Sequence, residues 1–296
     1  MNLSNSIDPH TKIGSVHLKV SLVNRSLDFY QQVLGFRLAS SQATRASLSP
    51  GANGDETPKT LLVLEEHPLA SPVHGRTGLY HFAILVPSRF ELARAVNNLV
   101  ESGWPLQGFA DHLVSEAVYL EDPDGNGIEI YRDRQRNEWP VTNGRIRMAT
   151  DPLDLQGLMS ELGDTPREAQ SPWSGLHPDT VIGHIHLRVA GIPEAEAYYC
   201  GILGFDLVQR YGPMAAFVSA GGYHHHIGFN TWESAGAPPP PPDSTGLDYY
   251  SILLPDPEAL SEVAGRLQRA EIPTEQTAEG LFSRDPSQNK ILLTVL

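Results

Sequence analysis

The chain contains an internal repeat, which restricts its possible folds more than any other feature of the sequence. The segment IGSVHLKV at 13–20 recurs as IGHIHLRV at 182–189, and Leu34-Gly35-Phe36 recurs with the same spacing as Leu203-Gly204-Phe205. A second pair of segments is TGLYHFAILVP at 77–87 and TGLDYYSILLP at 245–255. Repeats of this length indicate tandem copies of one structural unit. The sequence therefore predicts two halves, each built from two related modules.

Each module is predicted to fold as a strand, a helix and then three further strands. In 13–20, apolar residues alternate with polar ones, which is typical of a half-buried strand. Apolar residues at helical spacing follow at 26–34, with Gly35 placed to cap the helix, and helices are also expected at 91–102, 195–204 and 258–270. The four modules span roughly 11–70, 78–133, 180–235 and 245–296. The predicted fold class is α+β, with four βαβββ modules that form paired cup-shaped mixed sheets with helices outside.

The 296 residues, of which 40% are hydrophobic, are sufficient for two domains with substantial cores. We expect an N-terminal domain at 1–137, a linker at 138–178 and a C-terminal domain at 179–296. The linker is rich in Pro, Gly and Asp, with one short helix expected around 153–162.

The charge of the chain limits its expected partners. A net charge of −14 provides no basic surface for nucleic acid and does not favour an anionic membrane. Cys200 is the single cysteine, and no basic stretch followed by an apolar run opens the sequence, so we expect a cytoplasmic protein. A homo-oligomer is compatible with the sequence.

Several of these segments together resemble the vicinal oxygen chelate superfamily, which includes glyoxalases and extradiol ring-cleaving dioxygenases. The resemblance rests on the IGxxHLxV strand openings, on Leu-Gly-Phe after an aromatic pair, and on DPDGNGIE at 122–129. It covers nearly the whole chain. Within the superfamily, GGYHHHIGFNTW at 221–232 and DHLVSEA at 111–117 are similar to the catechol 2,3-dioxygenase-like branch.

The resemblance implies one metal in a cup that two modules share, held by a first-strand His from each module and by a last-strand Glu. Two imidazoles and one carboxylate on one face of an octahedron suit Fe(II), with Mn(II) as the alternative, and leave three positions for substrate oxygens and dioxygen. The first His corresponds to Ser15 or His184, the second to His81 or Tyr249, and the Glu to Glu129 or Leu292. Neither half alone carries the complete set.

Two arrangements could complete the set. In the first, modules two and three form the working cup, and His81, Glu129 and His184 are the ligands. In the second, the cup lies within the first half and His17, on the same strand face as Ser15, replaces it. We favour the first arrangement, because every departure from the family pattern falls in modules one and four.

The resemblance also implies second-sphere residues. His225 has the spacing to Phe229 of the family's acid–base His, Tyr119 has the spacing to Glu129 of its active-site Tyr, and His112 resembles a His that binds a substrate oxygen. Purely structural roles are also compatible with the sequence: Tyr119 could be a packing aromatic, and His17 and His186 could be ordinary partly buried strand residues. His224 and His226 are expected to point to the strand face opposite to His225.

Three functional classes are compatible with these residues. We favour a metal-dependent extradiol dioxygenase that cleaves a catechol-like aromatic diol with O2, because His225, His112 and Tyr119 supply acid–base groups. A glyoxalase-like isomerase or lyase would need a second carboxylate ligand, which is missing at Ser15 and Leu292. The third class is a non-enzymatic small-molecule binding protein.

Overall fold

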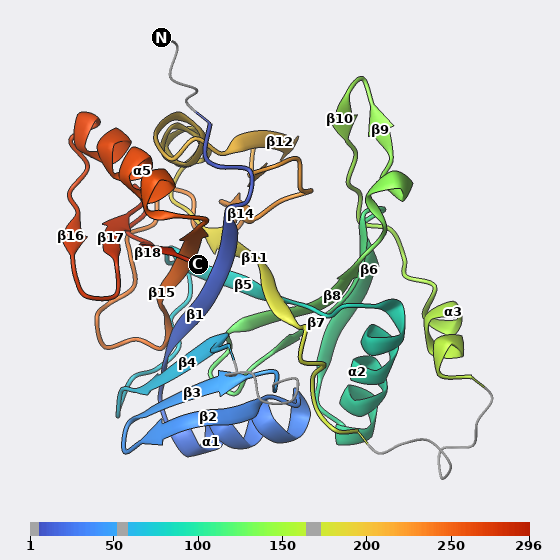
Figure 1. The fold of residues 1–296 in the computed structure, drawn as a ribbon. Coiled ribbons are helices and arrows are strands. Elements are labelled where there is room, and N and C mark those ends of the chain that lie inside the picture. Colours follow the sequence, from blue (N-terminus) through green and yellow to red (C-terminus); the bar gives the residue numbers. More distant parts are fainter. Residues whose placement is uncertain (1–5, 52–58, 164–172) are drawn as a thin grey trace.

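The strands form two large mixed sheets in the computed structural model, which describes residues 6–51, 59–163 and 173–296 (Figure 1). Each sheet takes half of its strands from each half of the sequence. We call them the outer-module sheet, from modules one and four, and the inner-module sheet, from modules two and three. This pairing confirms that modules two and three share a cup, as the sequence favours.

The central strands of each sheet are the first strands of its two modules. The outer-module sheet has the order β16 (Glu275–Gln276), β17 (Leu281–Arg284), β18 (Lys290–Val295), β15 (Gly246–Leu254), β1 (Lys12–Val20), β4 (Leu62–Glu66), β3 (Arg45–Ser49) and β2 (Arg37–Gln42). The inner-module sheet has the order β12 (Asp206–Tyr211), β13 (Ala215–Ser219), β14 (Ile227–Asn230), β11 (Val181–Arg188), β5 (Gly78–Leu85), β8 (Gly127–Asp133), β7 (Ser115–Glu121) and β6 (Leu106–Asp111).

The helices lie on the outside of the curved sheets, as the fold class predicts (Figure 1). They are α1 (Val23–Asp28), α2 (Arg89–Ser102), α4 (Ile192–Glu196) and α5 (Pro257–Arg269), and α1 and α4 continue into π-helical turns at Phe29–Val33 and Ala197–Ile202. Side chains of Ser88 and Asp256 cap the N-termini of α2 and α5. Gly35 and Gly204 end the two π-helical turns with φ of 78° and 90°, as expected for a left-handed cap.

Alternation along the strands separates the core from the cups. Phe82 and Ile84 of β5 and Ile128 and Ile130 of β8 belong to the main hydrophobic core. The intervening residues of β5, β8 and β11, which include His81, Glu129 and His184, lie on the other face. The pattern that builds the core therefore also directs the candidate ligands into the cup.

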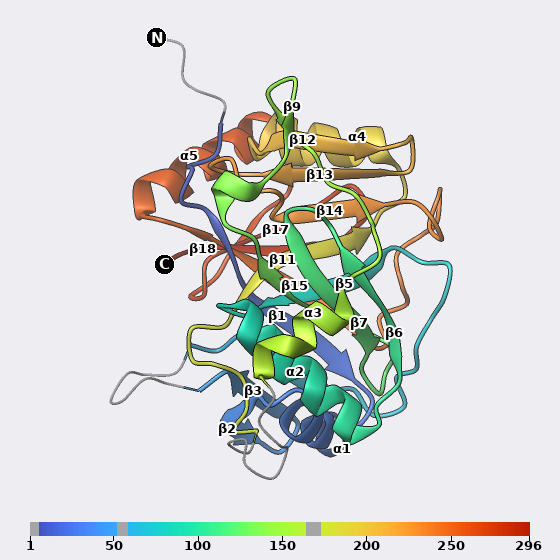
Figure 2. The same cartoon turned by 90° about the vertical axis from the view of Figure 1, so that its right-hand side faces the viewer.

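The predicted linker at 138–178 contains regular secondary structure. A 3-10 turn (Arg136–Glu138) leads into it. The linker then contains a hairpin of β9 (Val141–Thr142) and β10 (Arg145–Ile146), and α3 (Leu155–Met159), followed by a 3-10 turn at Ser160–Leu162. The helix expected around 153–162 is therefore present, and it packs beside α2 (Figure 2). Residues 164–172 of the linker lie outside the described residues.

No helix within the described ranges is both long enough and apolar enough to cross a membrane.

Candidate metal centre and cavity

Two histidines and one glutamate converge in the inner-module sheet. His81 is on β5, Glu129 on the neighbouring β8 and His184 on β11, which pairs with the other side of β5. One nitrogen or oxygen from each residue lies within 4.8 Å of the others. The structure thus brings residues from both halves of the chain together, as the cross-paired arrangement predicts.

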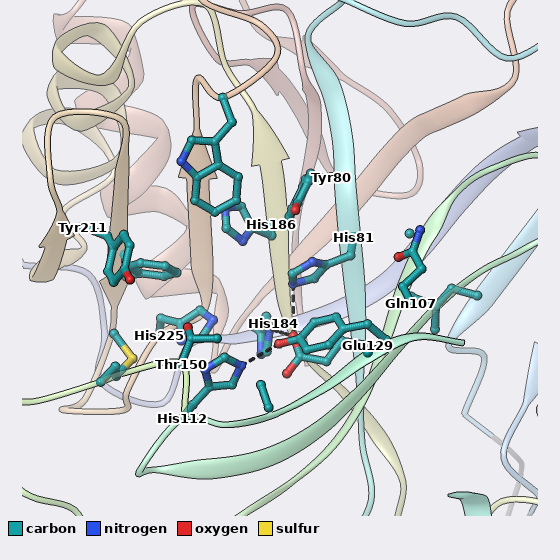
Figure 3. A pocket seen from close by; sticks show the side chains of 18 of the residues that line it. Tyr80, His81, Gln107, His112, Glu129, Thr150, His184, His186, Tyr211 and His225 are labelled. Atoms are coloured by element: carbon teal, nitrogen blue, oxygen red, sulfur yellow. Dashed lines mark hydrogen bonds and ion pairs between the residues drawn. The ribbon is translucent and has the colours of Figure 1, made fainter. Parts of the chain in front are cut away.

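The distances within this cluster suit a bound cation. Nε2 of His81 and Nε2 of His184 each lie 3.1 Å from Oε2 of Glu129 (Figure 3). Two donors at right angles, each about 2.1 Å from a metal, are separated by about 3 Å. The residues present therefore fit a divalent metal.

The electrostatics also favour a cation. Burial alone would raise the pKa of Glu129, but the imidazoles of His184 and His81 hold this pKa well below its ordinary value. Burial lowers the pKa of His184 to about 4, against the opposing effect of the Glu129 carboxylate. At neutral pH the pair therefore offers a carboxylate and a neutral imidazole, which are the protonation states that a metal requires.

The imidazole of His184 is held mainly by neighbouring rings. Its Nδ1 is buried and has no hydrogen-bond partner among the described residues. The ring of His225 lies 4.1 Å from it and that of Tyr131 lies 4.7 Å from it, measured between centroids. Packing thus supplies the orientation that a hydrogen bond often gives to a metal-binding His.

A cavity of about 490 Å³ opens above the cluster, and all six site residues predicted from the sequence line it (Figure 3). These residues are His81, His112, Tyr119, Glu129, His184 and His225. His17 is elsewhere: it lies in the outer-module sheet, stacked on Tyr249 at 3.9 Å, with Nε2 2.9 Å from the hydroxyl of Ser15. The alternative in which His17 completes this cluster does not agree with the structure.

His225 is the first member of a chain of hydrogen bonds. Its Nδ1 lies 2.8 Å from Nδ1 of His224, and Nε2 of His224 lies 2.8 Å from Oδ1 of Asp133. A carboxylate only accepts, so Nε2 of His224 donates to it; with one proton on each ring, His225 then donates through Nδ1. The lone pair of His225 then lies on Nε2, and burial lowers the pKa of this ring well below its ordinary value.

The expectation that His224 and His226 lie on a strand is wrong, but of the three histidines it is His225 that lines the cavity, as expected. The three histidines precede β14, so strand alternation does not apply to them, and all three are buried. His224 carries the link from His225 to Asp133, and Nδ1 of His226 accepts a hydrogen bond from the backbone N–H of Ala220.

Tyr119 of β7 and His112, which follows β6, form a second hydrogen-bonded pair at the cavity. Nδ1 of His112 donates to the carbonyl of Ala149 at 2.7 Å, and Nε2 lies 2.6 Å from the hydroxyl of Tyr119. Burial raises the pKa of Tyr119 well above its ordinary value, and the charge of Glu129 raises it further. Tyr119 is therefore a neutral phenol here, and with one proton on His112 it donates to that ring.

Some residues that line or support the site were not predicted from the sequence: Tyr131 and Asp133 contact His184 and His224, and His186 lines the cavity. Tyr131 and Asp133 share the face of β8 with Glu129, so the alternation of the strand could have identified both. His186, for which the sequence allows an ordinary structural role, lines the cavity beside His81. Its Nε2 lies 3.0 Å from the side-chain amide of Asn230.

Residues near the mouth of the cavity come from both modules. Arg188 donates to the carbonyl of Leu79 at 2.8 Å and lies over the ring of Tyr80, 5.5 Å from its centroid. Tyr80 and Trp232 contact at 5.3 Å in an edge-to-face arrangement. The cavity therefore has a charged and polar base and a largely aromatic rim, a lining typical of a small-molecule site.

The chain is similar to known proteins both in its sequence and in its fold. The model of the glyoxalase/bleomycin resistance protein/dioxygenase superfamily matches residues 12–130 and 181–293. A catechol-2,3-dioxygenase of Bacillus subtilis is 45% identical over 98% of this chain and 99% of its own length. A lactoylglutathione lyase of Neisseria meningitidis is 29% identical, over 41% of this chain and 90% of its own length.

Solved structures show the same fold at low sequence identity. A protein of Bacillus subtilis matches with a TM-score of 0.60 at 16% identity, covering 96% of this chain and 85% of its own. Glyoxalase I from Zea mays matches with a TM-score of 0.54 at 13% identity, covering 96% of this chain and 92% of its own.

Proposed function

The chain belongs to the glyoxalase/bleomycin resistance protein/dioxygenase superfamily, and from this membership we propose that it is a metal-dependent extradiol dioxygenase. It opens the ring of a catechol-like aromatic diol next to the hydroxyl groups, with O2 as the second substrate. The relative that is 45% identical over nearly the full length of both chains, a catechol-2,3-dioxygenase, supports this activity. The single cysteine is in keeping with a cytoplasmic site of action.

The observation that carries the proposal is the composition of the donor cluster. His81, Glu129 and His184 supply two imidazoles and one carboxylate, which we assign as the ligands of Fe(II), with Mn(II) as the alternative. Such a metal would provide adjacent positions where the two diol oxygens and O2 come together. The metal-capable group among the described residues holds a single carboxylate, which counts against the glyoxalase-like alternative.

The remaining residues act on the protons of the diol. Nε2 of His225 has a lone pair at the cavity, so we assign His225 as the base that takes a hydroxyl proton and later returns it. The phenol oxygen of Tyr119, whose own proton goes to His112 at 2.6 Å, accepts the hydrogen of the second diol hydroxyl. The aromatic rim packs on the substrate ring.

Metal analysis of three variants, together with O2 uptake on addition of catechol, tests this proposal. His81→Ala and Glu129→Ala should lose the metal, whereas the matched variant His17→Ala should retain it, because His17 lies in the other sheet. Metal loss in His17→Ala alone would overturn the ligand assignment. Metal-loaded protein that consumes no O2 with catechol or substituted catechols would reject the activity in favour of a lyase or a binding protein.

The role of His225 leads to a separate prediction. His225→Gln should retain the metal and slow turnover by a factor on the order of 10²–10⁴, as expected when an acid–base group is removed. Steady-state O2 uptake and metal content measured on the same preparation would check both parts. Unchanged turnover would remove His225 from the mechanism.

A further inference from the structure

A short segment of the linker forms one wall of the cavity. Met148, Ala149 and Thr150 line it, although the sequence places them in the connection between the two halves. The inner-module sheet ends in two edge strands, β12 and β6, which belong to different halves of the chain. We call residues 148–150 the strap, because this segment runs between these two edges.

The strap is attached to both edges by hydrogen bonds. On the β6 side, Asp111 and Asp151 exchange two backbone hydrogen bonds, at 2.8 and 2.9 Å, as in an antiparallel pair. On the β12 side, the side-chain amide of Gln209 accepts from the N–H of Met148 at 2.9 Å and donates to its carbonyl at 3.2 Å. One glutamine side chain thus takes the place of a neighbouring strand.

The strap also orients a candidate catalytic side chain. The carbonyl of Ala149, the residue after Met148, accepts from Nδ1 of His112. This hydrogen bond directs Nε2 of the same ring to the hydroxyl of Tyr119. A continuous path of contacts therefore runs from Gln209, through two backbone positions, to His112 and Tyr119.

We propose that Gln209 is a positioning residue, which fixes the strap across the open side of the cup and acts on the reaction through His112. The proposal rests on the dioxygenase function proposed above. A carbonyl that shifts by about 1 Å no longer makes a good hydrogen bond, so the ring of His112 would lose its fixed orientation. Gln209 itself need not touch the substrate for this effect.

The test combines amide exchange with a double-mutant cycle on the metal-loaded enzyme. Gln209→Met keeps the length of the side chain and removes both hydrogen bonds. It should speed hydrogen exchange at residues 148–151 and lower kcat roughly tenfold or more, with a smaller change in KM. In a His112→Gln background, the same change should alter kcat less than about twofold.

Two further variants serve as a matched control and as a test of partial rescue. Gln276→Met is the matched control, because the Gln276 amide binds the carbonyls of Thr277 and Gly280 at the far edge of the other sheet. It should change neither kcat nor exchange in the strap. Gln209→Glu can still accept from the N–H of Met148 and should recover part of the lost rate.

Three outcomes would overturn the proposal. Unchanged exchange at residues 148–151 in Gln209→Met would show that the amide does not hold the strap. Unchanged kcat, or an equal loss with and without His112, would show that the effect does not pass through that ring. Exchange is measured without turnover, so failure of the dioxygenase assignment would be recognised separately, by wild-type protein inactive on catechols.

Discussion

At the scale of single residues, the glycine before His184 leaves room for the ring that supports it. A Cβ atom at Gly183 would clash with the hydroxyl of Tyr131 and would lie 3.0 Å from Cβ of Leu85. Tyr131 packs on the imidazole of His184 and shares a 2.8 Å hydrogen bond with the hydroxyl of Tyr223. A methyl group at this position would therefore displace the support of a candidate ligand.

Gly183→Ala should destabilise the fold by about 1–3 kcal/mol through overpacking and should also lower metal occupancy. Gly14→Ala is the matched control, since its Cβ would clash with Ser251 Oγ in the outer-module sheet. It should destabilise the protein without affecting the metal. Denaturant unfolding and metal analysis measure the two effects, and equal metal loss in both variants would contradict this account of His184.

The candidate ligands were largely predictable at this scale, but their surroundings were not. His81, Glu129 and His184 stand where the repeat and the family resemblance place them, and complementary losses in the two halves point to a shared cup. Gln209 has no such signal. Its role depends on where the linker passes, which no local pattern in the sequence determines.

At the scale of elements, the Asp-Pro turns connect each last strand to a neighbouring module. Asp122 is buried and accepts hydrogen bonds from the hydroxyl of Tyr30, from the backbone of Asp124, and from the backbone and side chain of Asn126. Asp285 repeats this arrangement with Tyr199 in the second half. Both segments are therefore turns that also have a structural role, because each holds a tyrosine of a neighbouring module.

Asp122→Ala should cost roughly 3 kcal/mol or more, because it leaves several buried donors without an acceptor. Tyr30→Phe removes only one donor and should cost about 1 kcal/mol. Asp122→Ala should also weaken metal binding, since its turn leads into β8, which carries Glu129. Asp285→Ala, whose turn leads into β18, should destabilise the protein and retain the metal; metal loss there would contradict the assignment of the two cups.

The helices and strands lie close to the positions predicted from the sequence, and the departure in the first helix is accompanied by a long-range contact. Alternation predicted β1, and helical spacing predicted α2 and α5 to within a residue or two. The helix expected at 26–34 begins earlier, at Val23, and ends in a π-helical turn that brings Tyr30 to Asp122. A contact with another module decides that turn, so local propensity could not reveal it.

At the scale of the whole molecule, the two cups differ in the side chains at the ligand positions, and those of the outer cup pack on one another. Tyr249, in the position that corresponds to His81, stacks on His17, and its hydroxyl donates to Glu279 at 3.1 Å. Phe282 packs edge-to-face on Tyr249, with Lys290 4.1 Å from the centroid of the Phe282 ring. Tyr249 and Leu292, which stand at two of the ligand positions, thus pack with Phe282 in an apolar cluster instead of forming a donor cluster.

The packing around His17 predicts an acid-sensitive fold. Burial, together with the charges of Arg45 and Lys290, lowers the pKa of His17 to about 3, against 6.5 for an unperturbed ring. As the pH falls below 6.5, His17 becomes protonated in the unfolded chain but stays neutral in the folded one. The free energy of unfolding therefore decreases progressively between about pH 6.5 and pH 3.

His17→Gln should therefore reduce the acid-induced loss, by about 1–2 kcal/mol at pH 4.5 after allowance for the partial exposure of the ring. Unfolding by urea at several pH values measures it, with His10→Gln at an exposed position as the control. Parallel pH profiles for the wild type and His17→Gln would show that His17 contributes nothing to this sensitivity.

Each of the two sheets takes strands from both halves of the chain. We therefore expect that neither half folds correctly without the other. Residues 1–168 carry His81 and Glu129 but lack His184, and their strand β5 would lose its partner β11. Produced alone, this piece should bind little metal and expose the apolar edge of a divided sheet; produced together with residues 169–296, it should recover both metal and assembly. Size-exclusion chromatography and metal analysis measure this, and stoichiometric metal binding by residues 1–168 alone would mean that a single half can build the centre.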